Sequence, residues 1–459
     1  MHTSGLQLES DARPAAAGVA WPLLLWMLVA TSLASFRQRS GDELFDAGGI
    51  DWQVKFQILC WTALGALCCW FVVSGRADLR LLRRGPLFWY TGFALWAMVS
   101  ALWSPAPALT AFRGFQHLVA VGLAISLGVN LHRIYLFIGV FLLVNWVLVV
   151  MGLLGLDLGQ AWIRDPVHPD TYYEGPWRFA SAYGHPSWIS IVAAVGAVGL
   201  AARTRGRQWL WAGPVVAWFV VTNLATMSRT AIAGMVGGFV VAAFGRRSLL
   251  PLVCLVGFVS AAVLLPDPTR DAMGWFVRRG QSSEDFKSLT GRKALYREAL
   301  RRAEQAWPLG TGFQSGRVNP LDETGSLVSM GHAHNLVLES LSGLGLPGML
   351  LALMVVASTV ANLGLLLWMY PERGTVDPAP SWELAAMLVP LFAFCVLDSG
   401  FASRVDSTTL LFVAVLARLQ TTIGDAHLPG VTTAAKPQAL ERMSDHLPQR
   451  QSDRLGLSS

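Results

Sequence analysis

Two histidines and an asparagine stand directly before an apolar run in the segment GHAHNLVLESLSGLGLPG, residues 331–348. Imidazole is the side chain that most often serves as a general base, and His334 stands where a helix is expected to begin. The positive end of a helix dipole disfavours the imidazolium, so we expect His334 to be neutral and able to accept a proton. Asn335 would orient a ligand beside it. For His332, a ligand contact and a hydrogen bond within the loop are both open.

Two arginines stand alone at expected helix starts, Arg229 in MSRTAIAGMVGG and Arg292 in TGR. A guanidinium beside outward-pointing backbone N–H groups provides a seat for phosphate. The alternative is that each arginine snorkels to a membrane interface. Arg297, Arg301 and Arg302 follow Arg292 along a predicted amphipathic helix, and such a charged stripe is typical of a solvated or lipid-facing helix face.

The elements that position these residues are membrane spans. The chain is 53% hydrophobic and 14% charged, holds 19 Trp, and has a mean hydropathy of +0.47. A bilayer core takes roughly 20 apolar residues per helix, and we predict an all-α polytopic membrane protein with about twelve transmembrane helices and one large helical periplasmic loop. The predicted spans are 19–36, 54–74, 87–103, 115–131, 134–155, 187–202, 209–226, 230–245, 249–265, 335–370, 383–399 and 408–421.

Short loops rich in arginine stay in the cytoplasm and set the orientation. A separate crossing by 335–345 would move the C-terminal tail outside, so 335–345 and 347–370 are taken as one helix broken at glycine and proline. The arginines of the three inner loops are Arg76, Arg80, Arg83 and Arg84; Arg203, Arg205 and Arg207; and Arg246 with Arg247. The predicted order is a cytoplasmic tail, nine helices, a periplasmic loop with an amphipathic helix, three helices and a disordered cytoplasmic tail, at 1–18, 19–265, 266–333, 334–421 and 422–459.

Composition weakens other classes of function. A transporter is expected to bury ionisable groups in its spans, and here the spans hold few of them, among which are Lys55, Glu339 and Asp398. The five cysteines lie within predicted spans without disulfide or metal spacing. A net charge of +6 suits a positive inner face, and no nucleic-acid motif accompanies it. With no carboxylate cluster at metal-ligand spacing, we expect no metal and no cofactor.

Several segments together resemble the O-antigen ligase and polymerase superfamily. His334 and Asn335, followed by Gly345 and Gly348, are similar to its HN, nine residues, G, two residues, G signature. MSRTA around Arg229, LTGR around Arg292, PLGTGF at 308–313, and RFASAYGHPSW around Arg178 and His185 follow its other recurring segments in the same order. The resemblance covers most of residues 170–370.

The resemblance implies a glycosyltransferase of the bacterial inner membrane with its active site facing the periplasm. An O-antigen ligase would move a glycan from undecaprenyl diphosphate to a lipid A core hydroxyl, inverting the anomer. His334 would be the base, and Arg229 and Arg292 would stabilise the diphosphate. Arg178, His185, His332, Asn335 and Arg317 would bind substrate.

Two other readings stay open. A polymerase or a protein oligosaccharyltransferase would share the donor chemistry, although polymerases of this superfamily usually have two large outer loops rather than one. A lipid or ion transporter is the second of these readings.

Overall fold

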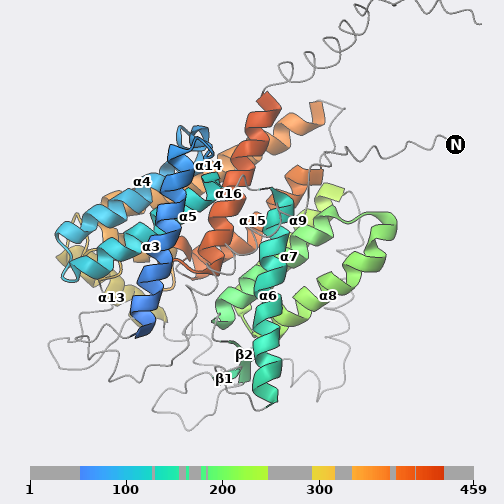
Figure 1. Ribbon diagram of the computed structural model, residues 1–459, viewed down its shortest axis with the longest axis horizontal. Helices are drawn as coiled ribbons and strands as arrows, with labels where there is room; N and C mark the ends of the chain where they lie inside the picture. Colours follow the sequence, from blue (N-terminus) through green and yellow to red (C-terminus); the bar gives the residue numbers. More distant parts are fainter. Residues whose placement is uncertain are drawn as a thin grey trace, which may run out of the picture.

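The computed structural model describes residues 52–126, 130–154, 162–164, 177–181, 185–246, 292–315, 333–372, 379–398 and 400–427. These residues form a bundle of helices with one small pair of strands at one end (Figure 1). The predicted spans at 19–36 and 249–265 lie outside the described residues. Every other predicted span coincides with a helix.

The bundle is made of long apolar helices, and the short elements join or cover them. The long helices are α3 (Trp52–Val73), α4 (Pro86–Val99), α5 (Pro107–Ser126), α6 (Leu131–Leu153), α7 (Pro186–Arg203), α8 (Trp209–Ala225), α9 (Arg229–Arg246), α14 (Leu336–Glu372), α15 (Ala379–Leu397) and α16 (Ser407–His427). The short elements are η1 (Leu79–Leu82), η2 (Ser100–Leu102), β1 (Trp162–Arg164), β2 (Trp177–Phe179), η3 (Gly206–Gln208), α13 (Arg292–Gln305) and η5 (Gly400–Ala402).

Seven helices of the described part are long and apolar enough to cross a bilayer, and two shorter apolar helices accompany them. The prediction of a multi-pass all-α membrane protein is therefore confirmed, while the count of twelve stays a prediction. Two boundaries differ from the hydropathy pattern. Helix α5 begins at Pro107 rather than 115 because it includes Arg113, whose guanidinium binds the Gln116 side-chain oxygen at 2.9 Å. Helix α16 continues to His427, past the predicted end at 421.

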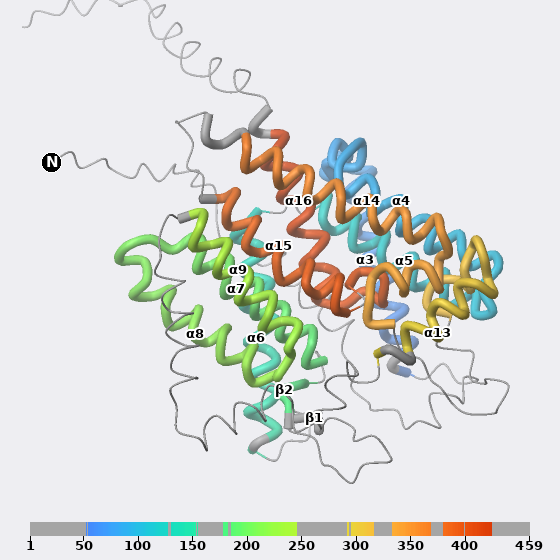
Figure 2. The backbone as a smooth tube through the Cα atoms, turned by 180° about the vertical axis from the view of Figure 1, so that it is seen from behind, coloured from blue at the N-terminus to red at the C-terminus, as the bar shows by residue number. Residues whose placement is uncertain are grey.

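Helices α7, α9 and α15 pack side by side in the centre (Figure 2). Glycines allow this approach, because a Cβ on Gly234 would lie 2.6 Å from Pro390 Cα and one on Gly238 would lie 3.0 Å from the Ala386 carbonyl oxygen. The order of these contacts makes α9 antiparallel to α15. The same register carries Arg229, the first residue of α9, to the level of the last turn of α15.

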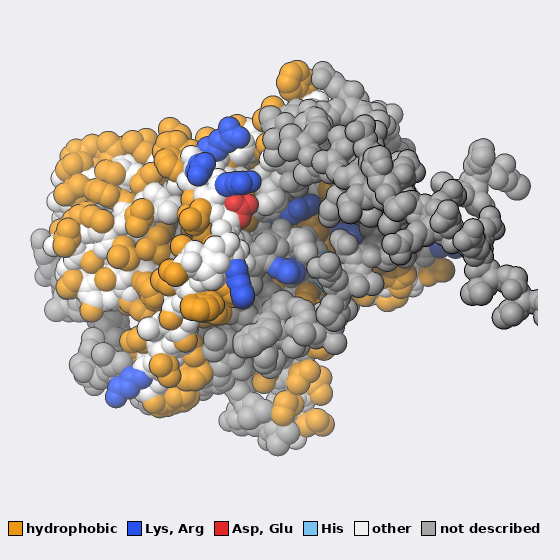
Figure 3. Space-filling view, turned by 45° about the horizontal axis from the view of Figure 1, so that its top comes forward, with side chains coloured by type: hydrophobic (Ala, Val, Ile, Leu, Met, Phe, Trp, Pro, Cys, Tyr) orange, Lys and Arg blue, Asp and Glu red, His pale blue; other side chains and the backbone are white. Residues whose placement is uncertain are grey.

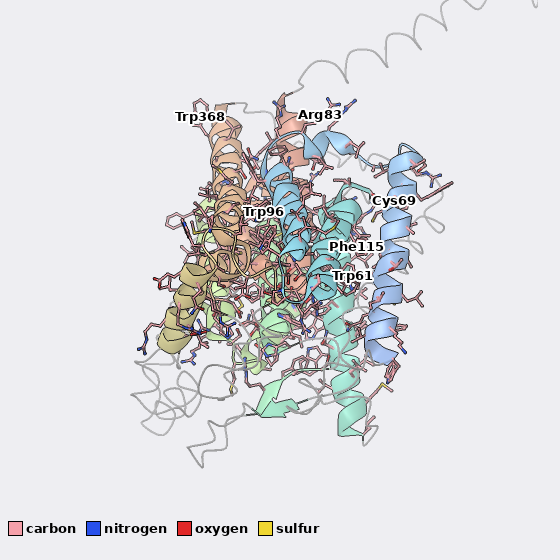
Figure 4. All side chains as sticks on the ribbon, turned by 90° about the vertical axis from the view of Figure 1, so that its left-hand side faces the viewer. Trp61, Cys69, Arg83, Trp96, Phe115 and Trp368 are labelled. Atoms are coloured by element: carbon pink, nitrogen blue, oxygen red, sulfur yellow. The ribbon has the colours of Figure 1, made fainter. Side chains whose placement is uncertain are left out.

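Two of the arginine-rich loops, and Arg246 at the end of α9, lie at the opposite end of the bundle from this turn. Arg203 Nη1 lies 4.0 Å from Glu383 Oε1 near the start of α15, and Gln420 of α16 donates to the Arg84 carbonyl oxygen at 2.6 Å. Glu383 precedes Leu397 by about 21 Å of helix at 1.5 Å per residue. Figure 4 shows Arg83 and Trp368 at the same, upper end of the bundle, on different elements. Figure 3 shows basic side chains between broad hydrophobic areas.

Helix α14 is broken at Gly345, as the glycine and proline pattern predicted. Gly345 has φ 66° and ψ −164°, which are not helical. Residues 308–313 lie along the break and satisfy its backbone groups: Leu346 N donates to Pro308 O at 2.9 Å, and Gly312 N donates to Gly343 O at 2.8 Å. The PLGTGF segment, residues 308–313, therefore stabilises the bend at Gly345, and we call this segment the brace.

Gly345→Ala is expected to destabilise the protein, whereas Gly343→Ala is its matched control. The backbone conformation of Gly345, which essentially only glycine adopts, costs an L residue about 1–3 kcal/mol, and the new methyl would also overlap the Pro308 carbonyl oxygen. A Cβ on Gly343 meets nothing closer than 3.5 Å, and alanine there favours helix. Thermal unfolding in detergent should show a lower Tm for the first variant alone. Equal Tm values for the two variants would contradict the brace.

Candidate functional site

The C-terminal end of α15 gathers three of the predicted site residues. Arg292 Nη1 donates to Leu397 O at 2.7 Å, Asn335 Nδ2 donates to Val396 O at 3.1 Å, and His334 Nδ1 lies 3.1 Å from Asp398 Oδ1. The last carbonyls of a helix have no partner within the helix, so they are ready acceptors for such donors. These contacts fix the starts of α13 and α14 to the C-terminal end of α15.

The prediction that His334 begins a helix is wrong. Helix α14 starts at Leu336, and Asn335 is its N-cap, with Oδ1 accepting from Val337 N at 3.0 Å and Leu338 N at 3.1 Å. The Asn335 amide is thus engaged on both sides, which indicates that it holds the helix start rather than a ligand. His334 therefore precedes this cap and is not itself part of the helix.

His334 instead has a left-handed backbone, with φ 49°, and a carboxylate partner. Such a backbone is uncommon for a residue with a side chain and is found at functional sites. An ionised Asp398 can only accept, so the proton of a neutral His334 lies on Nδ1 and the lone pair lies on Nε2. The side chain is 36% exposed and Asp398 16%, so the pair borders open space.

Glu339 fixes the residue on the other side of His334. Its Oε2 accepts from Ala333 N at 2.7 Å, while its own N–H donates to Asn335 O at 2.9 Å. Glu339 therefore holds the chain on both sides of His334, through its side chain at Ala333 and through its backbone N–H at Asn335. The sequence marked Glu339 only as an ionisable residue within a span.

The remaining predicted residues are placed as follows. Arg178, on β2, is buried, and its Nε donates to Thr226 O at 2.9 Å, so it supports the corner that leads to Arg229. Strand β2 pairs antiparallel with β1, with Arg178 opposite Ile163. His185 is the N-cap of α7, where its Nδ1 accepts from Ser187 N at 3.3 Å. His332 and Arg317 lie outside the described residues.

The remaining arginines of α13 form a charged face, as the pattern indicated. Arg301 and Arg302 both bind Glu298, at 2.7 and 2.8 Å. The hydrogen bond from Arg301 is the main cause that lowers the pKa of Glu298 to about 2, and Arg302 adds to it. Helix α13 packs against α14, and its Ala299 and Ala303 are buried.

Metal binding was not expected, and this stays a prediction. Within the described ranges, no group of three His, Cys, Asp or Glu side chains could hold a metal ion. The outer-loop carboxylates Asp322 and Glu323 lie outside those ranges.

Sequence analysis missed the role of Asp398. It stands 64 positions after His334, and the only available signal was its charge at the end of an apolar span. No local pattern pairs two residues at such a separation.

The fold and this end of the bundle define the class: a multi-pass helical membrane protein with a His–Asp pair and arginines gathered at one end. Residues 214–353 match the family described as O-Antigen ligase, and this match supports a member of the O-antigen ligase and polymerase superfamily. The matched segment includes Arg229, Arg292 and His334 but not Asp398. No curated protein matches the chain. The family supports a membrane glycosyltransferase of the ligase or polymerase type, with a lipid-linked glycan donor and a lipid acceptor.

Proposed function

We propose that the protein is an O-antigen ligase of the bacterial inner membrane, which transfers a glycan from undecaprenyl diphosphate to a hydroxyl of the lipid A core. The observation that carries the proposal is the His334–Asp398 contact at the end of α15, where Arg292 is also bound and to which the α9 register carries Arg229. A base, its orienting carboxylate and two cations are the groups that displacement of a diphosphate requires.

In this mechanism the acceptor oxygen attacks the anomeric carbon of the donor. His334 Nε2 takes the hydroxyl proton as the new C–O bond forms, while Asp398 holds the ring through Nδ1. The bond between the anomeric carbon and the diphosphate oxygen breaks, and its electron pair leaves with the diphosphate. Arg229 and Arg292 stabilise that charge, so no metal or other cofactor is needed. A single displacement inverts the anomer.

The proposed site faces the periplasm. This orientation rests on two arginine-rich loops and Arg246 at the other end of the bundle, because short basic loops stay in the cytoplasm. The glycan donor would then reach the site at the periplasmic surface of the inner membrane. Arg178 and His185 belong to the same end, and together with His332 and Arg317 they remain candidates for substrate contact.

A polymerase with the same donor chemistry is the second candidate, since the matched family supports both reactions. Purified protein in detergent should be given the lipid-linked donor with lipid A core, and in parallel the donor alone. A ligase yields glycosylated lipid A core, whereas a polymerase lengthens the donor glycan. Product anomers should be inverted, and turnover should survive EDTA. Donor lengthening with no transfer to lipid A core would reject the ligase, and loss with EDTA restored by Mg²⁺ would reject the metal-free mechanism.

A further inference from the structure

Arg404 lies in the connection between α15 and α16, and the proposed mechanism gives it no role. Its guanidinium carbon lies 4.5 Å from the centroid of the Trp188 ring, in the first turn of α7. The His185 ring is also close to Trp188, with centroids 5.8 Å apart. Arg404 is partly buried. A guanidinium stacked on tryptophan has lost much of its freedom to move.

The nearest carboxylate does not bond to this guanidinium. Asp406 is buried and caps α16, where its Oδ1 accepts from Thr408 Oγ1 at 2.6 Å and from Thr409 N at 2.8 Å. Its Oδ2 has no hydrogen-bond partner in the described part of the chain. Arg404 thus stacks on Trp188, and Asp406 is the opposite charge that acts on it among the described residues. Burial lowers the pKa of the Arg404 guanidinium, and Asp406 opposes that shift.

Among the described residues, none accepts a hydrogen bond from the Arg404 guanidinium. The other arginines at this end differ, because Arg292 donates to Leu397 O and Arg178 donates to Thr226 O. Partly buried donors are normally satisfied, so the acceptors of the Arg404 N–H groups are solvent, undescribed parts of the chain or a ligand. A planar fork of donors that is already held in place is suited to a phosphate group.

Arg404 also lies at the end of the bundle that carries His334. Helix α15 ends at Leu397, Asp398 follows it, and α16 begins at Ser407, so the connection runs along this end. Helix α7 is antiparallel to α15, because Gly199 packs on Met387 and Arg203 lies near Glu383, and its start is therefore at the same end. Arg404 is outside the segment that matches the family.

We propose that Arg404, held on the Trp188 ring, is a further binding residue of the site and takes a phosphate group of a substrate. The proposal rests on the proposed function only in naming the substrates. The phosphate could belong to the donor diphosphate or to a phosphorylated acceptor. Both present the same oxyanion to the guanidinium.

The test compares Arg404→Ala, Arg404→Lys and Trp188→Phe with wild type, and Arg301→Ala serves as the matched control on α13. Arg404→Ala should raise the KM of one substrate by about tenfold to a hundredfold with little change in kcat, the expected loss for charge-assisted hydrogen bonds. Arg404→Lys should reverse only part of the rise in KM, because an ammonium cannot bind a phosphate bidentately. Trp188→Phe should give a smaller rise in the same KM. Arg301→Ala should change neither KM.

Inorganic pyrophosphate separates the two sources. If the donor is bound, Arg404→Ala should weaken protection against thermal unfolding by pyrophosphate in parallel with the donor KM. If the acceptor phosphate is bound, the acceptor KM alone should rise.

Two results would overturn the proposal: unchanged KM values for both substrates in folded Arg404→Ala, or a lower Tm with unchanged KM values, which would make Arg404 only a counter-charge for Asp406. Pyrophosphate binding needs no turnover. The pyrophosphate measurement would therefore still test Arg404 even if His334 were not the catalytic base.

Discussion

His334→Ala is expected to lower kcat by about 10²–10⁴-fold, the usual contribution of a general base, while the protein stays folded. The ring is 36% exposed and lies outside α14, so little packing is lost. The measurement is single-turnover transfer from the lipid-linked donor, with Tm as the check on folding. His132→Ala is the control, because His132 is an exposed histidine near the start of α6, at the other end of the bundle.

Asp398→Ala should reduce the same rate by a smaller factor, because the base remains but its orientation is lost. Full activity of purified, folded His334→Ala would remove the base from the mechanism. An effect of Asp398→Ala that persists in the absence of His334 would show that Asp398 acts by another route.

Arg292→Ala is expected to reduce kcat/KM by about 10²–10³-fold, the effect of removing one donor that stabilises transition-state charge. Arg229→Ala should act similarly. Arg292 must contribute through the guanidinium N–H groups not used by Leu397 O, since a guanidinium carries five. Lysine at either position should restore little activity, because an ammonium cannot make the two parallel bonds that a phosphate accepts.

Donor kinetics of the Ala and Lys variants at both positions are the measurement. Arg301→Ala again controls for the charge of this end, since Arg301 pairs with Glu298 on α13. Full activity of both Lys variants would show that Arg229 and Arg292 contribute only positive charge and do not bind the phosphate bidentately.

The sequence was sufficient for the class of protein and for much of its organisation. Bilayer thickness and the need to satisfy every backbone polar group act on continuous stretches of chain, so hydropathy predicts each described span from local residues. The break at Gly345 was equally local, because glycine and proline signal it directly. The motifs around Arg229, Arg292 and His334 could be found since each is a short segment.

Tertiary structure decided how those motifs meet. The left-handed backbone of His334, its Asp398 partner and the binding of Arg292 to Leu397 O depend on where α15 ends. That position is set by close packing of α9 on α15 through Gly234 and Gly238, and by the brace of residues 308–313 on α14. Contacts between helices far apart in the chain leave no period in the sequence, because apolar residues face lipid and neighbouring helices alike. The sequence therefore determined which groups are available for chemistry, and only helix packing determined which of them lie together.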